Sequence, residues 1–567
     1  MREEQKSGKI VPFSQDHDFY YNRAIRCMDR DDIEQAAYYA SRAAAMDENN
    51  AQCRLELAGL YSEMGRFARS NELLMGLIAE ENEDLSECWL GAGCNFASLQ
   101  YYGCARDALH HCLDLEDGDT LRAQDALDVL EPIEDYCDGD DEDRTTWYLH
   151  HRVMEARELF YDGRMQEARA LFAQLDAVEP LFMDVRNFYA RTLFELGKCE
   201  RAIELCRWVT KRYPSDVLAL CSLADFYRRT HQKDEEDAAI ARILELNYER
   251  DMESTDDLVE VSRTLYRAER YDEAQTRLVS ILRMDPCRRE AMHLLAACAY
   301  MKEDYDEAIS VWQRMTRIDP EDAVCEYYLA HTLRVKSGKS HRRRAIEADV
   351  LLPESEAMRR LVRIHKALED IPAARQKWKN RQREFLSLIR WGCEQAGLRK
   401  TMSVFLCMMG DERAATILRG MLLHPSADED LKRHICAALK TMGAKEPYYL
   451  IAGDELAQVR VKRRENAGRQ TTQTAAVLRI ASENLPEDAP ESMTQTLENM
   501  WTRFLDSPPK TPLIRSPQAY AAALEYCYWM HRGQRKSKSE LIRKYGANLA
   551  AFNRALMKLS AALADEE

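Results

Sequence analysis

Two consecutive stretches decide the fold of this chain: SRTLYRAERYDEAQTRLVSILRMDP at 262–286 and AACAYMKEDYDEAISVWQRMTRIDP at 296–320. Each begins with a small residue, passes through a tight turn, continues as an alanine-centred amphipathic run and ends on proline. MEARELFYDGRMQEARALFAQLDAVEP (154–180) and YARTLFELGKCERAIELCRWVTKRYP (189–214) follow the same plan. A recurrence of about 34 residues is typical of an array of helical hairpins. Because proline just past a helix end cannot continue the helix, each proline starts the next unit.

The register of this array places small residues where the two helices of one unit must touch. Unit starts are expected near Asp16–His17, Ala51, Ser86, Leu149, Met183, Val217, Thr255, Arg289 and Ala323. The eighth position of each unit is small: Ala24, Ala58, Gly93, Ala156, Ala190, Ala224, Ser262, Ala296 and Ala330. The second helix opens on a small residue at Ala36, Ser70, Ala105, Ala168, Ala202, Ala274 and Ala308. The sixth unit has Glu236 there, so we expect its second helix to be less stable.

This pattern resembles the tetratricopeptide repeat (TPR) family, which implies an all-α solenoid of helical hairpins. We expect an N-terminal tail (1–16), a first TPR block (17–118), a helix followed by an acidic loop (119–148) and a second TPR block (149–335). Beyond these we expect a basic helical extension similar to HEAT repeats (345–460), a linker with one helix (461–515) and a small helix-turn-helix-like domain (516–562). The acidic string at 137–144 lacks the ligand spacing of a calcium loop, and we interpret it as solvated.

Composition and motifs argue against several classes of function. The 17 cysteines are scattered, with no two within four residues of each other, which excludes a CxxC motif and predicts buried thiols in a reducing compartment. The sequence has neither a secretory leader nor a membrane-length apolar run, so we expect a cytoplasmic protein with no membrane partner. It has no phosphate-binding loop, nucleophile elbow or HExxH motif, so we expect no catalysis, no cofactor and no metal.

Charge is distributed unevenly along the chain. Residues 1–350 carry 45 basic and 71 acidic side chains, whereas residues 351–567 carry 35 basic and 26 acidic. The second part is therefore where a polyanion would bind.

The first helices of a TPR solenoid line its concave face, and in the second block that face is rich in arginine and aromatic residues. The residues expected to bind a partner are Arg157, Asn187, Arg191, Arg228, Arg263, Tyr266, His293, Tyr300, Tyr327 and His331. Such a groove suits an extended, acidic or C-terminal peptide. Alternatively, the arginines pair with Asp184, Glu260 and Glu326 of neighbouring repeats. The lysines with which some TPR co-chaperones hold a chaperone carboxylate are absent, and only Asn187 comes near that pattern.

The C-terminal stretch SKSELIRKYGANLAAFNRALMKL (537–559) resembles the helix-turn-helix core of bacterial DNA-binding modules. Glu540–Leu541 fit its first helix, Tyr545–Gly546 its turn and Phe552 its buried position. The residues that would contact nucleic acid are Arg535, Lys536, Lys538, Arg543, Lys544, Arg554 and Lys558. The exposed recognition positions 549–551 read Leu-Ala-Ala, which form poor contacts with base edges, so a protein contact is the alternative.

The leading prediction is therefore a scaffold that binds an extended, acidic peptide in the TPR groove. The alternative is a TPR-coupled regulator that binds DNA or RNA through 516–562. A purely structural assembly subunit is a third hypothesis.

Overall fold

The computed structural model forms two compact units, Met1–Arg460 and Val461–Glu567, which are described separately. The described residues are 16–563 without 31, 48–49, 81–84, 117–119, 139–140, 179–182, 248–253, 340–344, 462–475, 486–490, 507–513, 515, 533 and 535.

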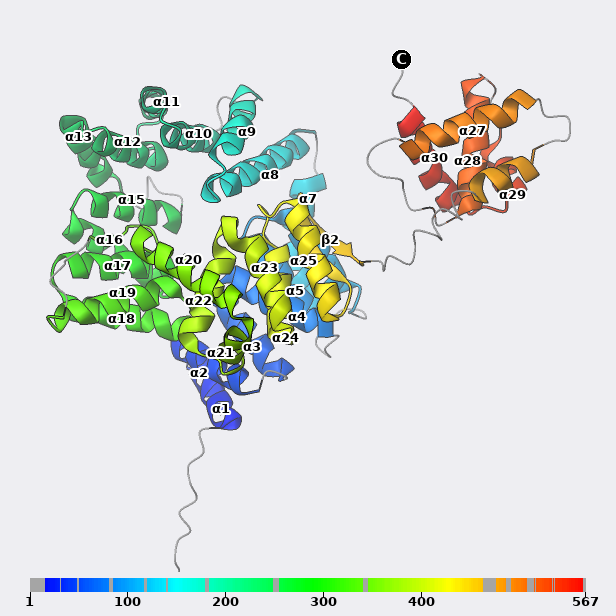
Figure 1. The fold of residues 1–567 in the computed structure, drawn as a ribbon. Helices are drawn as coiled ribbons and strands as arrows, with labels where there is room; N and C mark the ends of the chain where they lie inside the picture. Colours follow the sequence, from blue (N-terminus) through cyan, green and yellow to red (C-terminus); the bar gives the residue numbers. More distant parts are fainter. Residues whose placement is uncertain are drawn as a thin grey trace, which may run out of the picture. The chain divides into compact units, whose positions relative to one another are not determined.

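Helical hairpins follow one another along the first unit, as the sequence predicts (Figure 1). The first block contains α1 (His17–Met28), α2 (Ile33–Met46), α3 (Ala51–Glu63), α4 (Phe67–Glu80), α5 (Leu85–Ser98) and α6 (Tyr102–Leu113). The second contains α8 (Asp141–Tyr161), α9 (Met165–Val178), α10 (Met183–Glu195), α11 (Cys199–Arg212), α12 (Val217–Arg229), α13 (Lys233–Glu245), α15 (Thr255–Arg267), α16 (Tyr271–Met284), α17 (Arg289–Met301), α18 (Tyr305–Ile318) and α19 (Ala323–Lys336).

Most predicted unit starts coincide with the first residue of a helix, because a capping side chain stands just before them. Asp16, Asn50, Asp216 and Asp322 each accept a hydrogen bond from a backbone N–H of the first helical turn. Despite Glu236, α13 is a complete helix of 13 residues, so the expectation of a less stable helix finds no support in the backbone.

The small residues lie where the register places them. The eighth-position alanines of the earlier units are almost fully buried, and a Cβ built on Gly93 would meet Leu109 Cγ at 2.6 Å. Ala330 is the exception, because it is exposed. Among the described residues, α19 is not followed directly by the second helix of a repeat, so no such helix packs on Ala330.

The interruption between the blocks differs from the prediction. It contains α7 (Leu121–Asp138), after which α8 begins at Asp141 rather than near Leu149. The second half of the acidic string is thus helical in its backbone. The side chains at 136–148 lie outside the described residues, so the solvated-loop interpretation stays a prediction.

The two blocks meet each other and enclose the extension. Arg314 of α18 is bonded to Glu34 of α2 at 3.0 Å, which joins the late repeats to the first one. Figure 1 shows the extension between the first block and α15–α19. The extension consists of α20 (Glu354–Glu369), α21 (Ile371–Lys379), α22 (Arg383–Glu394), a 3-10 turn (Ala396–Leu398), α23 (Arg399–Met409), α24 (Glu412–Leu422) and α25 (Glu429–Met442). Its likeness to HEAT repeats stays a prediction.

The extension ends in a β-hairpin that the sequence analysis missed. Strands β1 (Tyr448–Ala452) and β2 (Glu455–Val459) pair antiparallel, with Gly453 and Asp454 between them. The hairpin docks on α6, where Asp454 Oδ2 accepts a hydrogen bond from Gly103 N at 2.9 Å. A two-residue Gly-Asp turn between alternating residues was the readable signal.

The second unit is a helical cluster with its own core. It contains α27 (Glu491–Asp506), α28 (Pro517–His531), α29 (Lys538–Lys544) and α30 (Leu549–Leu563), and residues 476–483 are also helical. Val477 and Trp501 share this core with Phe552. The helical parts of 461–515 therefore belong to the domain rather than to a linker, because their apolar faces are needed to complete the core.

Candidate functional site

The first helices of the second block form what we call the inner face: α8, α10, α12, α15, α17 and α19. Several predicted groove residues are buried on it. Asn187, Tyr266, His293 and Tyr300 are between 0% and 6% exposed. Asn187 donates a hydrogen bond to Asp216, the residue that caps α12. These four side chains cannot be open to a partner in this conformation, which corrects that part of the groove prediction.

Two of these four side chains, Tyr266 and His293, contact a segment of the chain itself, residues 345–352 (AIEADVLL), which we call the strap. Its described residues are neither helix nor strand, and it joins α19 to α20. Ile346 and Ala348 are 3% and 7% exposed, whereas Glu347 between them is exposed. This alternation is typical of an extended segment with one face against a surface.

Side chains of the inner face bind the backbone of the strap. Burial lowers the pKa of His293, so its ring is neutral at pH 7 and its Nε2–H donates to a carbonyl. Three strap carbonyl oxygens accept bonds: Ile346 from Tyr266 Oη (2.8 Å), Glu347 from His293 Nε2 (2.9 Å) and Leu351 from Tyr328 Oη (3.2 Å). Bonds to main-chain carbonyls hold an extended chain regardless of its sequence.

A charge ladder runs along the same face, and the strap supplies one of its acids. We use this name for two groups of ion-paired residues, Arg191–Glu260–Arg263 and Arg267–Asp225–Arg228, which Asp349 of the strap connects. Asp349 of the strap lies 3.0 Å from Arg263 Nε and 2.7 Å from Arg267 Nη2. The other contacts are Arg191–Glu260 at 3.2 Å, Arg263–Glu260, Arg267–Asp225 at 3.8 Å and Arg228–Asp225 at 2.7 Å.

The ladder bears on the alternative prediction that the arginines of this face pair with carboxylates of the repeats, one of which is Glu260. Glu260 pairs with Arg191 of α10 and with Arg263 of its own helix, α15; burial alone would raise its pKa, but Arg191 and Arg263 bring it below the ordinary value. Four guanidinium groups nevertheless face only Glu260 and Asp225 within the ladder. The ladder therefore has more positive than negative groups, and Asp349 of the strap partly balances them.

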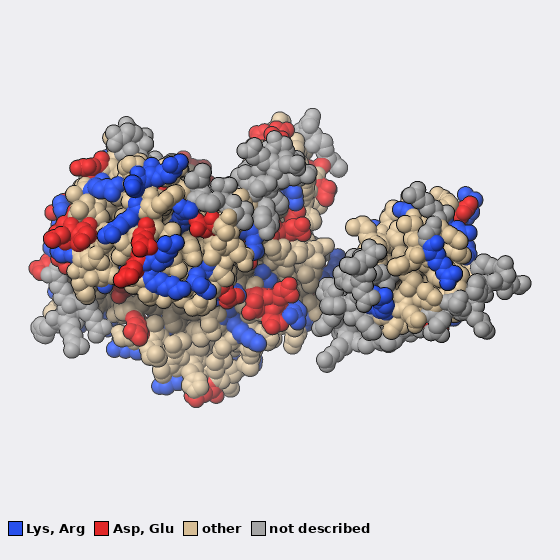
Figure 2. Space-filling view, turned by 90° about the horizontal axis from the view of Figure 1, so that it is seen from above, with Lys and Arg blue, Asp and Glu red and all other residues tan. Residues whose placement is uncertain are grey.

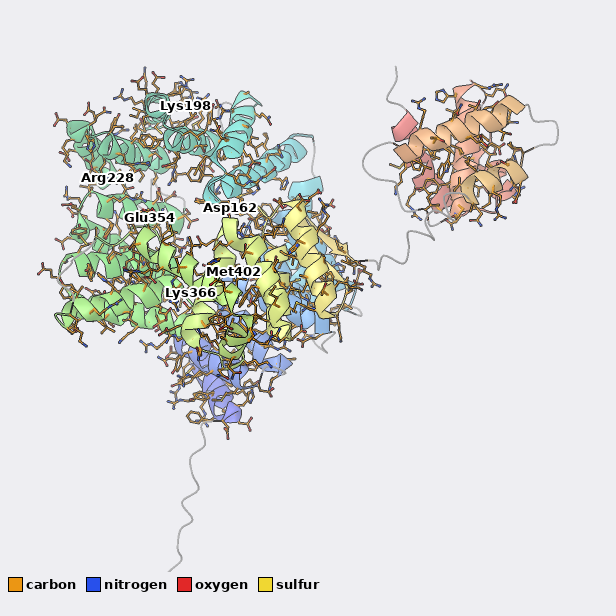
Figure 3. The ribbon with its side chains drawn as sticks, viewed as in Figure 1. Asp162, Lys198, Arg228, Glu354, Lys366 and Met402 are labelled. Carbon is orange, nitrogen blue, oxygen red and sulfur yellow. The ribbon has the colours of Figure 1, made fainter. Side chains whose placement is uncertain are left out.

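The inner face continues beyond the strap at α8, α10 and α12. The Arg157 guanidinium stacks on Phe188 at 5.0 Å, and Arg191 lies 5.9 Å from the Phe160 ring. Arg228 keeps 39% of its side chain exposed and lies on the side of α12 toward α15 (Figure 3). Tyr161, at the end of α8, is 62% exposed. This part combines cationic, aromatic and partly open side chains.

The predicted residues of the last repeat pack on one another. Tyr327 stacks on His331, with ring centroids 6.0 Å apart, and His331 Nε2 lies 3.1 Å from Tyr300 Oη. Tyr327 and His331 remain partly exposed.

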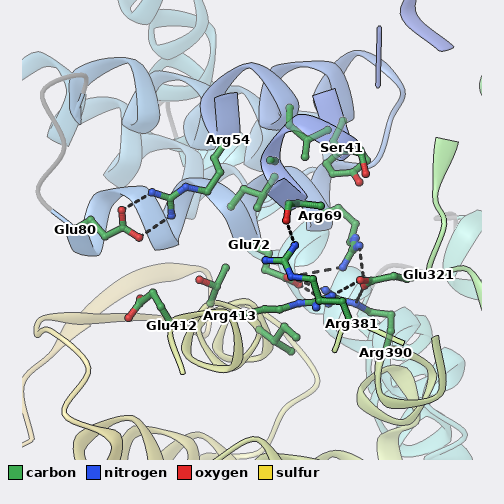
Figure 4. Close-up of a pocket in the computed structure, with 17 residues that line it drawn as sticks. Ser41, Arg54, Arg69, Glu72, Glu80, Glu321, Arg381, Arg390, Glu412 and Arg413 are labelled. Carbon is green, nitrogen blue, oxygen red and sulfur yellow. Dashed lines mark hydrogen bonds and ion pairs between the residues drawn. The ribbon is translucent and has the colours of Figure 1, made fainter. Parts of the chain in front are cut away.

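A second cationic region, which the sequence analysis missed, lies where the extension meets the first block (Figure 4). A cavity of about 230 Å³ is lined by Arg54, Arg69, Arg381, Arg390 and Arg413 together with Glu72, Glu80, Glu321 and Glu412. Each of these glutamates is within ion-pair distance of an arginine. The network therefore holds the extension against the first repeats.

In the second unit, α29 and α30 are joined by a turn at Tyr545–Gly546, as predicted. Lys544 Nζ lies 2.7 Å from Glu525, a carboxylate only 4% exposed, so its charge is balanced within the unit. The ammonium groups of Lys536 and Lys538 lie over the rings of Trp529 and Tyr526. Arg543, Arg554 and Lys558 are exposed, and Arg535 lies outside the described residues.

The described part of this unit is mostly neutral on the face seen in Figure 2, with separate basic groups rather than one continuous patch. Leu549 and Met557 of α30 are 59% and 73% exposed. Apolar exposure of this kind fits a protein contact at least as well as a phosphate contact.

Among the described residues, no group of three His, Cys, Asp or Glu side chains is placed to hold a metal ion. The described helices include none with the length and hydropathy needed to cross a bilayer.

The fold and the inner face define a helical-hairpin repeat protein, and comparison with known proteins identifies the repeat. One tetratricopeptide repeat model matches residues 153–216, 190–246 and 262–323, and a second matches 28–91. The chain therefore carries tetratricopeptide repeats in both blocks, and such repeats indicate a protein–protein interaction scaffold.

Individual relatives are distant. TPR repeat-containing protein YvcD of Bacillus subtilis is 25% identical over 231 residues, which cover 40% of this chain and 46% of that protein. Cellulose synthase operon protein C of Xanthomonas axonopodis pv. citri is 24% identical over 306 residues, covering 52% and 19%. The chain thus spans less than half the length of either relative. The solved TPR protein TTC0263 of Thermus thermophilus is 18% identical with a TM-score of 0.29, covering 33% of this chain and 98% of that structure.

Proposed function

We propose that this protein is a cytoplasmic interaction scaffold that binds an extended, acidic peptide along the inner face at α8, α10 and α12. The observation that carries the proposal is the strap. On the neighbouring repeats of the same face, an extended acidic segment is held by side-chain bonds to its carbonyls and by arginine pairs to Asp349. The adjoining repeats offer the same kind of side chains.

Electrostatics and stacking support the same ligand. Arg157 and Arg228 are partly exposed at two rungs of the face, and the exposed Tyr161 ring lies at the end of α8. An acidic side chain placed beside either arginine would form charge-assisted hydrogen bonds, which are about twice as strong as neutral ones. An extended peptide can also accept hydrogen bonds at its main-chain carbonyls, as the strap does.

The test is capture of partners from the native host with the full chain. The variant Arg157→Glu/Arg228→Glu reverses two charges of the inner face without touching the buried Glu260 pairs. The matched control, Arg201→Glu/Lys211→Glu, makes the same charge change on the exposed side of α11. A protein captured by the wild type and the control but lost in the inner-face variant supports the proposal.

If all three proteins capture the same partners, the inner face is not the binding surface and the proposal fails. Nuclease treatment in parallel identifies any partner held through nucleic acid. The predicted nucleic-acid contact in the second unit has no support from the comparisons and is not proposed.

A further inference from the structure

We infer that the strap is an internal ligand, and that the face of α15, α17 and α19 accepts in its place a partner peptide of the same pattern: an apolar residue, an exposed residue, a small residue, an acidic residue and an apolar residue. This inference rests on the proposed function, because it takes the inner face as a peptide-binding surface. It adds the recognition pattern and the competition between the strap and the partner.

The pattern is read from the strap contacts. Ile346 and Ala348 lie against the face and are the only strap side chains less than a tenth exposed. Any larger residue in place of Ala348 would have to displace its surroundings, so this position selects a small side chain. Asp349 forms ion pairs with Arg263 and Arg267, which fixes an acid at the next position. The carbonyl bonds add affinity without adding sequence preference.

The strap is held in a way that permits exchange. Asp349 retains 45% of its side-chain exposure and Leu351 is 59% exposed, so the second half of the strap is open to solvent. A cavity of about 390 Å³ adjoins that half, lined by Tyr161, Val350, Leu351 and Trp391 among others. A partner peptide can therefore engage the face next to Leu351 and replace the strap from its C-terminal end.

Because the strap competes with a partner peptide for the same face, it lowers the apparent affinity of the protein for that peptide. The strap is tethered at both ends, and a short tether gives an effective concentration on the order of millimolar. A free peptide of the same sequence must therefore bind weakly to the wild type and more tightly once the strap is loosened.

The experiment uses the full chain and a fluorescent synthetic peptide, AIEADVLL. The release variant Ile346→Ser/Asp349→Asn alters only the strap and leaves the face intact. We expect it to bind the peptide about tenfold more tightly than the wild type. A peptide with Asn in place of its Asp should lose that gain, as should a release variant that also carries Arg267→Gln. A scrambled peptide is the control.

Equal binding by the release variant and the wild type overturns the inference, provided their circular dichroism and melting curves agree. If the double variant does not fold, the single variant Asp349→Asn gives the same test with an expected gain of about threefold, and no gain overturns the inference. A release variant that becomes a dimer by light scattering also overturns it, because the occupant would then be a second copy. Failure here, together with capture that still depends on Arg157 and Arg228, leaves the proposed function standing.

Discussion

The ion pair between Arg390 of α22 and Glu72 of α4 gives the sharpest test of how the extension is held. Arg390 donates two hydrogen bonds to the Glu72 carboxylate, at 2.5 and 2.8 Å, and each side chain is only 12% exposed. The change Arg390→Met retains an apolar stem similar to that of arginine and removes the charged guanidinium group. Glu72 is then left with Arg69 at 3.7 Å as its nearest cation.

Breaking a buried pair by removing one partner costs about 3–5 kcal/mol, because the remaining charge is buried and poorly compensated. We expect the lower end, about 3 kcal/mol, because Arg69 remains close. The matched control is Arg201→Met: its pair with Glu204 is 67% and 64% exposed, and such pairs contribute at most about 1 kcal/mol.

The assay is urea unfolding followed by far-UV circular dichroism. Because a repeat protein can unfold in parts, the first transition is the one compared. We expect Arg390→Met to move it to lower urea and Arg201→Met to leave it nearly unchanged. If the two variants coincide, the network between extension and first block does not stabilise the fold, and the reasoning from burial is refuted.

Two further predictions concern acid and packing. Burial raises the pKa of Glu321, but Arg69, Arg413 and Arg390 outweigh it and lower the value from 4.5 to about 2. The stability from this group is therefore present above pH 4.5 and lost as pH falls toward 2; Glu321→Gln should lower stability at pH 7 and reduce the acid-induced loss, and an unchanged pH–stability profile would contradict the assignment. Gly93→Ala should destabilise by about 1–3 kcal/mol, because its Cβ would meet Leu109 at 2.6 Å. The control Gly59→Ala, with nothing within 4 Å of its Cβ, should be neutral or stabilise by up to about 1 kcal/mol, and equal melting temperatures for both variants would speak against close helix packing at Gly93.

The sequence indicated which residues lie on the inner face, but not what they contact there. The helical register assigned Tyr266, His293 and Arg263 to one face of the repeats, and in the structure all three contact an extended acidic segment. That the segment is the chain's own strap could not be read from the sequence, because residues far apart in the chain meet only in the folded structure. Among the described residues, no second helix of a repeat follows α19 directly, and Ala330 is exposed although the repeat pattern predicted a buried position.

The sequence by itself determined the helical repeats, most of their starts and most of their small contact residues, because these depend on local spacing and on caps within one or two turns. It also suggested the chemistry of the inner face, since arginine at one rung of several repeats is visible in the pattern. Only the tertiary structure decided that the late repeats meet the first one through Glu34, that the extension is fixed by buried pairs to Glu72 and Glu321, and that the strap occupies part of the groove. The pairs with Glu34 and Glu72 join residues 280 and 318 positions apart, and the strap contacts at Tyr266 and His293 join residues 80 and 54 positions apart. Such contacts follow from how curvature accumulates over many repeats, which no short sequence pattern encodes.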